Sequence, residues 1–230
     1  MMRTRLIKVA VFLVFCLGLL PIQARADNIQ LVGVGGNNAE GVYTVPYYLT
    51  INDSGQIAVM CDDYTHDVSM NETWTATIIT NLTSSNYQTT RPGATTANGG
   101  YGLDFTHTVS VYAELFWLYA QWQLHPGDAN AVNFAAWKIL DTTLDISTVS
   151  GGLATTYYND AVNDHKNDSL SAYNYEIITP TNLLSGNGPH GSSPQEYITL
   201  VPEPNTLTLL GAAMLGLAVL SRRKKGTALQ

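Results

Sequence analysis

The sequence predicts an α+β domain in which an antiparallel β-sheet, or a barrel-like N-terminal half, is followed by a three-helix insertion and returning C-terminal strands. Three observations predict it. The first part of the chain is rich in Thr, Val, Tyr and Gly, with turn signals between short apolar runs. After residue 102 the apolar residues recur at helical spacing, and after residue 172 short strand-like runs return. This order of strands, helices and strands is typical of the α+β class.

The N-terminal half is predicted to contain four strands joined by polar turns. Residues 52–55, Asn-Asp-Ser-Gly, are a candidate hairpin turn between the second and third strands. Residues 82–102 contain Arg-Pro-Gly and Asn-Gly-Gly, and they are predicted to form a long loop. The four runs with the β-branched and aromatic composition of strands are residues 30–34, 42–51, 56–61 and 74–79.

Three helices are predicted next. Within residues 108–123, apolar side chains recur at the spacing of one helix face. Asp128 is a plausible N-cap for a second helix that runs to Leu140, and a third helix covers about residues 153–165. The two runs predicted to return as strands are residues 173–179 and 196–200.

The charge distribution separates the ends of the chain from its middle. Of 230 residues, 13% are charged, with 18 acidic and 11 basic side chains and a net charge of −7. Between Asp27 and Ser221 only three basic residues stand against all 18 acidic ones, which gives a net charge of −15. The low charged fraction excludes a charge-driven disordered chain, and the acidity excludes a basic nucleic-acid binder. No nucleic-acid partner is expected.

Residues 1–26 are predicted to be a secretory signal peptide. Three basic residues precede an apolar run over residues 9–20, and the small residues Ala24 and Ala26 mark a cleavage site. Cleavage would leave Asp27 as the first residue of an exported domain over residues 27–200, delivered by Sec-type export machinery. An uncleaved membrane anchor is the less favoured alternative, because the apolar run is short for a membrane span.

Residues 201–225 are predicted to be a sorting tail with a short transmembrane helix. An apolar run over residues 205–220 precedes a basic cluster, which is expected to stay on the cytoplasmic side. Residues 226–230 are predicted to be a short cytoplasmic extension. A plain C-terminal anchor without processing is the alternative. The residues of the tail motif are Val201, Pro202, Glu203 and Pro204 before the apolar run and Arg222, Arg223, Lys224 and Lys225 after it.

This order of a Pro-Glu-Pro triplet, a short apolar helix and a basic end resembles the PEP-CTERM sorting signal of Gram-negative bacteria. The resemblance implies an exosortase-like processing enzyme as a partner, and a transient inner-membrane anchor through the C-terminal helix. After removal of the tail, the protein is expected at the cell surface or in the exopolysaccharide matrix. Extracellular polysaccharide is a further candidate partner.

Cys61 is the lone cysteine left after signal cleavage, so the exported domain cannot form an internal disulfide. A lone Cys in an apolar strand is most often a small buried core residue. The residues around Cys61 in the sequence, and a predicted helix further along the chain, indicate a functional site as the alternative. Asp62 and Asp63 follow Cys61 directly, and a predicted helix carries Asn133 four residues before Trp137.

These two segments are similar to the thioester domain of bacterial surface adhesins. There, a strand Cys bonds to the Gln of a helix motif that ends in Trp. The resemblance implies Cys61 and Asn133 as a candidate thioester pair, with Asp62 and Trp137 lining the site. A spacing of four residues places Asn133 and Trp137 on one helix face. Asn133 departs from the family in having one methylene less than Gln.

Motifs of common enzymes are absent from the sequence. It contains no dinucleotide-binding fingerprint, phosphate loop, GxSxG elbow or HExxH pair. No catalytic residue, cofactor or metal is therefore predicted, and the protein is not expected to be an enzyme. The acidic stretch from Asp62 to Asp67, with His66, lacks the spacing of a calcium loop, and solvated acids are favoured over a cation site.

The sequence thus favours an exported cell-surface or matrix protein with a structural or adhesive role. Two alternatives stay open. One is a covalent adhesin that uses Cys61 and Asn133. The other is a non-covalent carbohydrate- or calcium-binding module.

Overall fold

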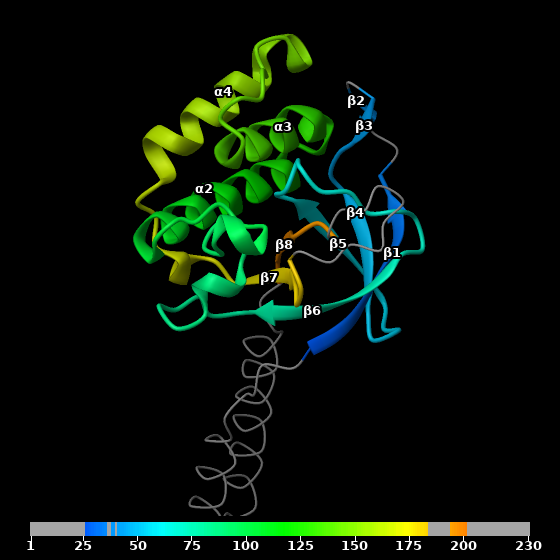
Figure 1. The fold of residues 1–230 in the computed structure, drawn as a ribbon. Coiled ribbons are helices and arrows are strands. Elements are labelled where there is room, and N and C mark those ends of the chain that lie inside the picture. Colours follow the sequence, from blue (N-terminus) through cyan, green and yellow to red (C-terminus); the bar gives the residue numbers. More distant parts are fainter. Residues whose placement is uncertain (1–25, 36–37, 40, 184–193, 202–230) are drawn as a thin grey trace, which may run out of the picture.

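The computed structural model describes residues 26–201, except residues 36–37, 40 and 184–193 (Figure 1). The predicted signal peptide, with its cleavage-site residue Ala24, lies outside the described residues apart from Ala26. The sorting tail also lies outside them apart from Val201.

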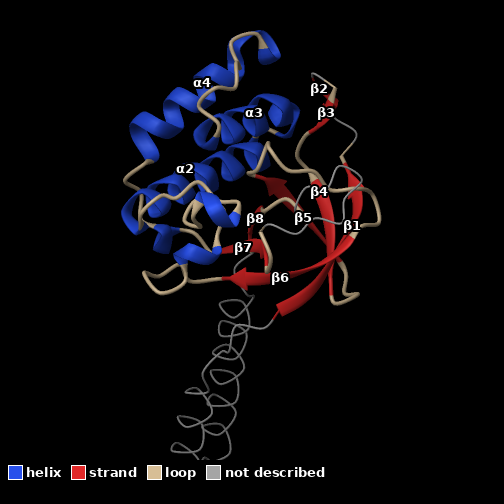
Figure 2. Cartoon of the chain, in the orientation of Figure 1, coloured by secondary structure: helices blue, strands red, loops and turns tan. Residues whose placement is uncertain are grey.

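Six strands close into an antiparallel barrel, which confirms the predicted fold class. Around the barrel the order is β1, β4, β5, β8, β7 and β6, so strands from the end of the domain close the barrel made by its beginning (Figure 2). The strands are β1 (Ala26–Val34), β4 (Tyr47–Ile51), β5 (Gln56–Cys61), β6 (Thr73–Ile79), β7 (Tyr175–Pro180) and β8 (Tyr197–Leu200), and a separate hairpin joins β2 (Asn38–Ala39) to β3 (Val42–Tyr43).

Buried and exposed side chains alternate along the barrel strands, and the buried ones fill the barrel interior. In β6, Trp74 and Ala76 are buried, whereas Thr73 and Thr75 are exposed. Successive side chains of a strand point to opposite faces, so this pattern directs one set into the core. β1 pairs with β4 on one side and with β6 on the other, and Ile29 faces a partner in each. The buried apolar set therefore forms one continuous core.

The predicted strand over residues 42–51 is wrong as a single element. The structure divides it into β3 and β4, with Pro46 immediately before β4. Proline has no backbone N–H to donate to a ladder, which explains a break at this point. The hairpin turn at residues 52–55 is present, and Asn52 and Asp53 adopt positive φ angles of 49° and 57° there. Asn and Asp tolerate this conformation better than most residues.

Three helices lie between β6 and β7 and pack beside the barrel (Figure 1). They are α2 (Phe105–Leu124), α3 (Ala129–Leu140) and α4 (Leu153–Asp160), and a π-helical turn, Ala161–His165, continues α4. The Oδ1 atom of Asp104 caps α2 by accepting a hydrogen bond from the His107 backbone N–H at 2.9 Å. Within the described part of the chain, no helix has the length and hydropathy needed to cross a membrane.

The predicted capping role of Asp128 is wrong. Asp128 stands at the N-terminus of α3, but its side chain makes no capping hydrogen bond. Instead its carboxylate accepts a hydrogen bond from the Tyr157 hydroxyl of α4 at 2.7 Å. A tertiary contact between two helices has replaced the local cap.

The predicted loop over residues 82–102 is present and is closely packed against the domain. It contains two short 3₁₀ turns, Tyr87–Thr89 and Thr96–Asn98. A Cβ atom at Gly93 would lie 2.3 Å from the Tyr87 carbonyl oxygen, so only glycine fits at this position. Arg91 of this loop is completely buried.

Candidate functional site

Cys61 is the last residue of β5, and its side chain is completely buried. Its thiol donates to the Asp63 carbonyl oxygen at 3.2 Å and accepts from the Asp63 backbone N–H at 3.4 Å. Burial raises the pKa of this thiol well above its usual value, and the nearby acids Asp63 and Asp62 raise it further. The group is therefore a neutral thiol at neutral pH, which makes it a poor nucleophile.

Asn133 lies directly beside Cys61. Its amide nitrogen donates to the Cys61 carbonyl oxygen at 2.8 Å, and its amide oxygen accepts from the Val45 backbone N–H at 2.7 Å. The side chain is fully buried and links α3 to the end of β5 and to the segment before β4. The structure thus brings the two predicted residues together, through the backbone of Cys61. A bond between the sulfur and the amide carbon stays a prediction.

Trp137 lies one helical turn after Asn133 and is 2% exposed. Its ring packs against Phe134 and Tyr64, with 5.0 Å between ring centroids in each case. The nearby indole N–H of Trp137 partly opposes the rise in the pKa of the Cys61 thiol, although it forms no regular hydrogen bond with the sulfur. Trp137 therefore covers the thiol from the helix side.

Asp62 points into a second buried cluster, where its neighbour is Glu196. Both carboxyl groups are fully buried, and no donor of the described residues reaches either Asp62 oxygen. Two ionised carboxylates can only accept hydrogen bonds, so this pair needs a shared proton. Burial, followed by the charge of Glu196, raises the pKa of Asp62 well above its usual value.

Glu196 has hydrogen-bond donors that Asp62 lacks among the described residues. The Tyr112 hydroxyl donates to one of its oxygens at 2.5 Å, and the Arg91 backbone N–H donates to the other at 2.9 Å. Burial raises the pKa of Glu196, but these donors oppose the shift. The pKa shifts therefore favour Asp62 as the protonated member of the pair.

Arg91 is a buried cation that the sequence analysis missed. Its Nε atom lies 2.8 Å from the Asp63 carboxylate, and both side chains are completely buried. The guanidinium also donates to the backbone carbonyls of Gly99, Leu183 and Pro194 at 2.8 to 3.0 Å. One signal was available in the sequence, because Arg91 is one of only three basic residues between Asp27 and Ser221.

The acids near Cys61 have separate partners and do not converge on one point. Asp62 faces Glu196, and Asp63 is held by Arg91 and by His66, whose Nδ1 atom is 2.8 Å away. Within the described ranges, no cluster of three or more His, Cys, Asp or Glu side chains has an arrangement that could hold a metal ion.

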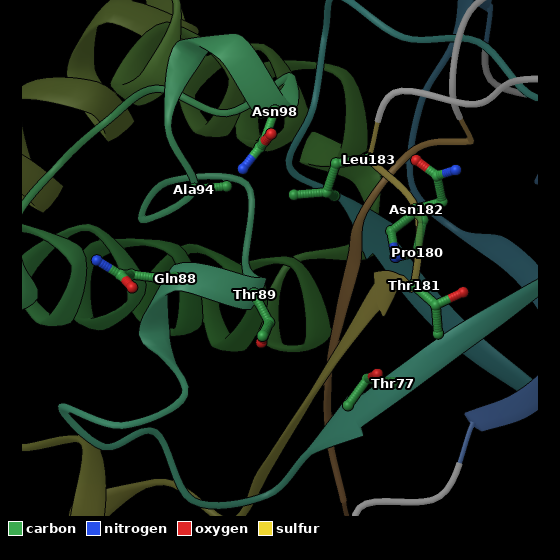
Figure 3. Close-up of a pocket in the computed structure, with 9 residues that line it drawn as sticks. All are labelled: Thr77, Gln88, Thr89, Ala94, Asn98, Pro180, Thr181, Asn182 and Leu183. Atoms are coloured by element: carbon green, nitrogen blue, oxygen red, sulfur yellow. The ribbon is translucent and has the colours of Figure 1, made fainter.

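A polar cavity of about 280 Å³ lies elsewhere, between the loop of residues 82–102 and the end of β7 (Figure 3). None of its described lining residues carries an ionisable side chain, so none of them can act as an acid or base in proton transfer. The lining residues are Thr77, Gln88, Thr89, Ala94, Asn98, Pro180, Thr181, Asn182 and Leu183.

Comparison with solved structures finds a distant likeness. The N-terminal thioester domain of a surface protein from Clostridium perfringens is 11% identical, with a TM-score of 0.47, over 77% of this chain and 100% of that chain. The N-terminal domain of the Streptococcus pyogenes pilus tip adhesin Cpa is 10% identical, with a TM-score of 0.41, over 80% of this chain and 97% of that chain. No curated protein matches the chain.

Comparison with protein families gives a match at the C-terminal end. Residues 200–224 match the PEP-CTERM protein-sorting motif. This match agrees with the interpretation of the Pro-Glu-Pro triplet, the apolar run and the basic cluster. The motif implies an exported protein that is anchored in the membrane and sorted by an exosortase, so this chain carries a PEP-CTERM sorting signal at its C-terminal end.

Proposed function

We propose that the protein is a non-enzymatic component of the cell surface or the exopolysaccharide matrix, with a structural or adhesive role. The observation that carries this proposal is the sorting motif at residues 200–224, at the far end of a chain that begins with a predicted signal peptide. Export places the domain outside the cell, and removal of the tail would free it from the membrane.

The chemistry of the domain supports a role without catalysis. The Cys61 thiol is neutral and buried, and the Asp62–Glu196 pair is enclosed in the core. Catalytic groups must reach a substrate and hold a pKa near the working pH. These groups instead join strands, helices and the loop of residues 82–102 into one unit, which suits a protein that bears load or presents a surface.

A covalent adhesin is the second candidate, and the 2.8 Å contact between the Asn133 amide nitrogen and the Cys61 carbonyl oxygen favours it. In this reaction the Cys61 sulfur would attack the Asn133 amide carbon, and ammonia would leave with the thiol proton. An amine or hydroxyl on a target surface would then attack the thioester carbonyl. That step forms an amide or ester and returns the Cys61 thiol.

Intact mass separates the two candidates. A structural or adhesive domain without the bond has the full mass of its sequence and one thiol that titrates after unfolding. A thioester shows the loss of one ammonia, and added methylamine increases the mass by one methylamine. The Cys61→Ala variant is the control, since it cannot lose ammonia by this route.

Localisation tests the sorting part of the proposal. With Pro202, Glu203 and Pro204 replaced by alanine, the tail is expected to stay attached and the protein to stay in the inner membrane. Alanine at Asn205, next to the triplet, is the matched control and should leave sorting unchanged. Arrival of the triple variant at the surface in normal amounts, with its tail removed, would contradict the proposal.

A further inference from the structure

An open groove of about 330 Å³ lies beside Trp137, on the outer side of the Cys61 site. Its walls come from β1, the β3 end of the small hairpin, the segment after β5, and α3. Gln195 joins the groove to the buried site, because its amide nitrogen donates to the same Asp63 carbonyl that accepts from the Cys61 thiol. The volume falls at the lower end of ligand sites, which span about 300–1,000 Å³.

Exposed apolar side chains gather at this groove. Four large hydrophobic side chains are exposed among the described residues, and three of them line it: Tyr43 at 51%, Met70 at 47% and Tyr64 at 36%. The fourth, Leu124, lies at the end of α2. Clustered exposure of this kind marks an interaction site more often than single exposed residues do.

Free hydrogen-bonding groups stand among these apolar side chains. Asp67 and Ser69 line the groove, and no hydrogen bond within the described residues uses the Asp67 carboxylate or the Ser69 hydroxyl. No basic side chain is among the described lining residues. With a net charge of −15 between Asp27 and Ser221, the groove disfavours anions.

The walls of the groove are held in place before any ligand binds. Leu31 of β1 accepts from the Asn71 backbone N–H at 2.8 Å and donates to the Glu72 carbonyl at 3.1 Å. Across the groove, the Tyr47 hydroxyl donates to the Tyr43 carbonyl at 2.6 Å. Preformed walls lower the entropic cost of binding.

We propose that this groove binds one or two uncharged sugar rings of an extracellular polysaccharide. A pyranose has an apolar C–H face, which fits against the exposed Tyr64 ring, and a hydroxyl edge, which can donate to Asp67. This inference rests on the proposed surface or matrix role, and it adds the site and the class of ligand.

Other ligand classes fit the groove less well. The centroids of the Tyr64 and Trp137 rings are 5.0 Å apart, so the two rings contact each other and leave no space between them for an ammonium ion. A peptide that binds by strand addition needs a free strand edge. The six-stranded barrel is closed, and the β2–β3 hairpin beside the groove has only two residues in each strand. Polyuronates would bring negative charge to Asp67.

Binding of neutral hexose oligosaccharides to the purified full chain tests the proposal. The probes are glucan, mannan and galactan oligomers, compared with a polygalacturonate, tetramethylammonium and a lysine-rich peptide. We expect saturable binding of at least one neutral oligomer, weakened about tenfold by Tyr64→Ala, because one aromatic contact is worth roughly that factor. Tyr43→Ala serves as a second variant, because its half-exposed side chain makes a folding defect less of a concern. Asp67→Asn should also weaken binding.

Leu124→Ala is the matched control, since it removes the exposed apolar side chain outside the groove, and it should bind as the unaltered protein does. The groove proposal is wrong if no neutral oligomer binds, if a cation or a polyuronate binds instead, or if the tyrosine variants bind as tightly as the control. A correctly sorted surface protein that binds no neutral sugar would overturn this inference alone. Failure of sorting would overturn the proposed function.

Discussion

Asn133 holds the end of β5 in place by donating its amide hydrogen to the Cys61 carbonyl oxygen at 2.8 Å. The same side chain accepts from the Val45 backbone N–H, so one buried amide binds backbone groups of two separate segments. The candidate site is therefore also a structural joint between α3 and the barrel.

Asn133→Ala is expected to destabilise the domain by about 2–6 kcal/mol. The change removes the side-chain partner of one buried N–H and of one buried C=O, and each group left unpaired costs about 1–3 kcal/mol. Urea unfolding measures the loss. Asn130→Ala, one turn earlier, removes a single hydrogen bond from Thr44 and should cost about 1 kcal/mol. Equal midpoints for the two variants would contradict the bridging role of Asn133.

The Cys61 thiol is expected to react with a maleimide or disulfide reagent at least about 100-fold more slowly in the folded protein than in urea. The thiol is completely buried and its pKa is raised, so reaction requires local opening of the structure. The reaction rate at pH 8, followed with and without urea, is the measurement. Rapid labelling of the folded protein would show that the thiol is exposed and would contradict its burial.

Asp62→Asn is expected to stabilise the domain at pH 7 and to leave it nearly unchanged near pH 4. Folding raises the pKa of Asp62, so the folded state keeps a proton that the unfolded state releases above about pH 4. This contribution to stability is fully present below the unfolded pKa and is lost as the pH rises toward the folded pKa. The amide of the Asp62→Asn variant can donate to Glu196 at every pH, so the variant does not lose stability as the pH rises.

The difference between Asp62→Asn and the unaltered protein should grow by up to about 1.4 kcal/mol per pH unit above pH 4. Unfolding in urea from pH 4 to pH 8 measures it. Asp104→Asn is a control of opposite sign, because hydrogen bonds from His107 lower the pKa of Asp104 in the folded state. Its stabilising contribution is present above the unfolded pKa and disappears as the pH falls. A pH-independent difference for Asp62→Asn would exclude the shared proton.

Arg91→Ala is expected to destabilise the domain by about 3–5 kcal/mol, because it leaves Asp63 as a buried charge without its main partner. A double-mutant cycle with Asp63→Asn should show a coupling free energy above about 1 kcal/mol, since each single substitution leaves the other buried group without its partner. His66→Ala removes a partly exposed partner of the same carboxylate and should cost less than about 1 kcal/mol. Additive effects of Arg91→Ala and Asp63→Asn would show that the pair does not act as a unit.

Local pattern was enough for much of the fold. The run at residues 56–61 was predicted with the bounds of β5, and the helical spacing after residue 102 marked α2 and α3. Prediction from the local pattern was wrong where a side chain forms a tertiary contact instead of a local one. Asp128 has the chemistry of a cap, but Tyr157 of a distant helix takes its carboxylate.

The strand–helix–strand order, the acidity of the domain and the C-terminal sorting signal can all be recognised in the sequence alone, because composition, periodicity and a short linear motif are local properties of a chain. The sequence also singled out Cys61 and Asn133. Three contacts became known only from the folded structure: Asn133 meets Cys61 through a backbone carbonyl, Arg91 is buried against Asp63, and Asp62 faces Glu196. Those pairings join residues from 28 to 134 positions apart in the sequence. Barrel closure and the need to pair buried polar groups determine which residues meet. A short stretch of sequence contains no information on either, because the partners lie far apart in the chain.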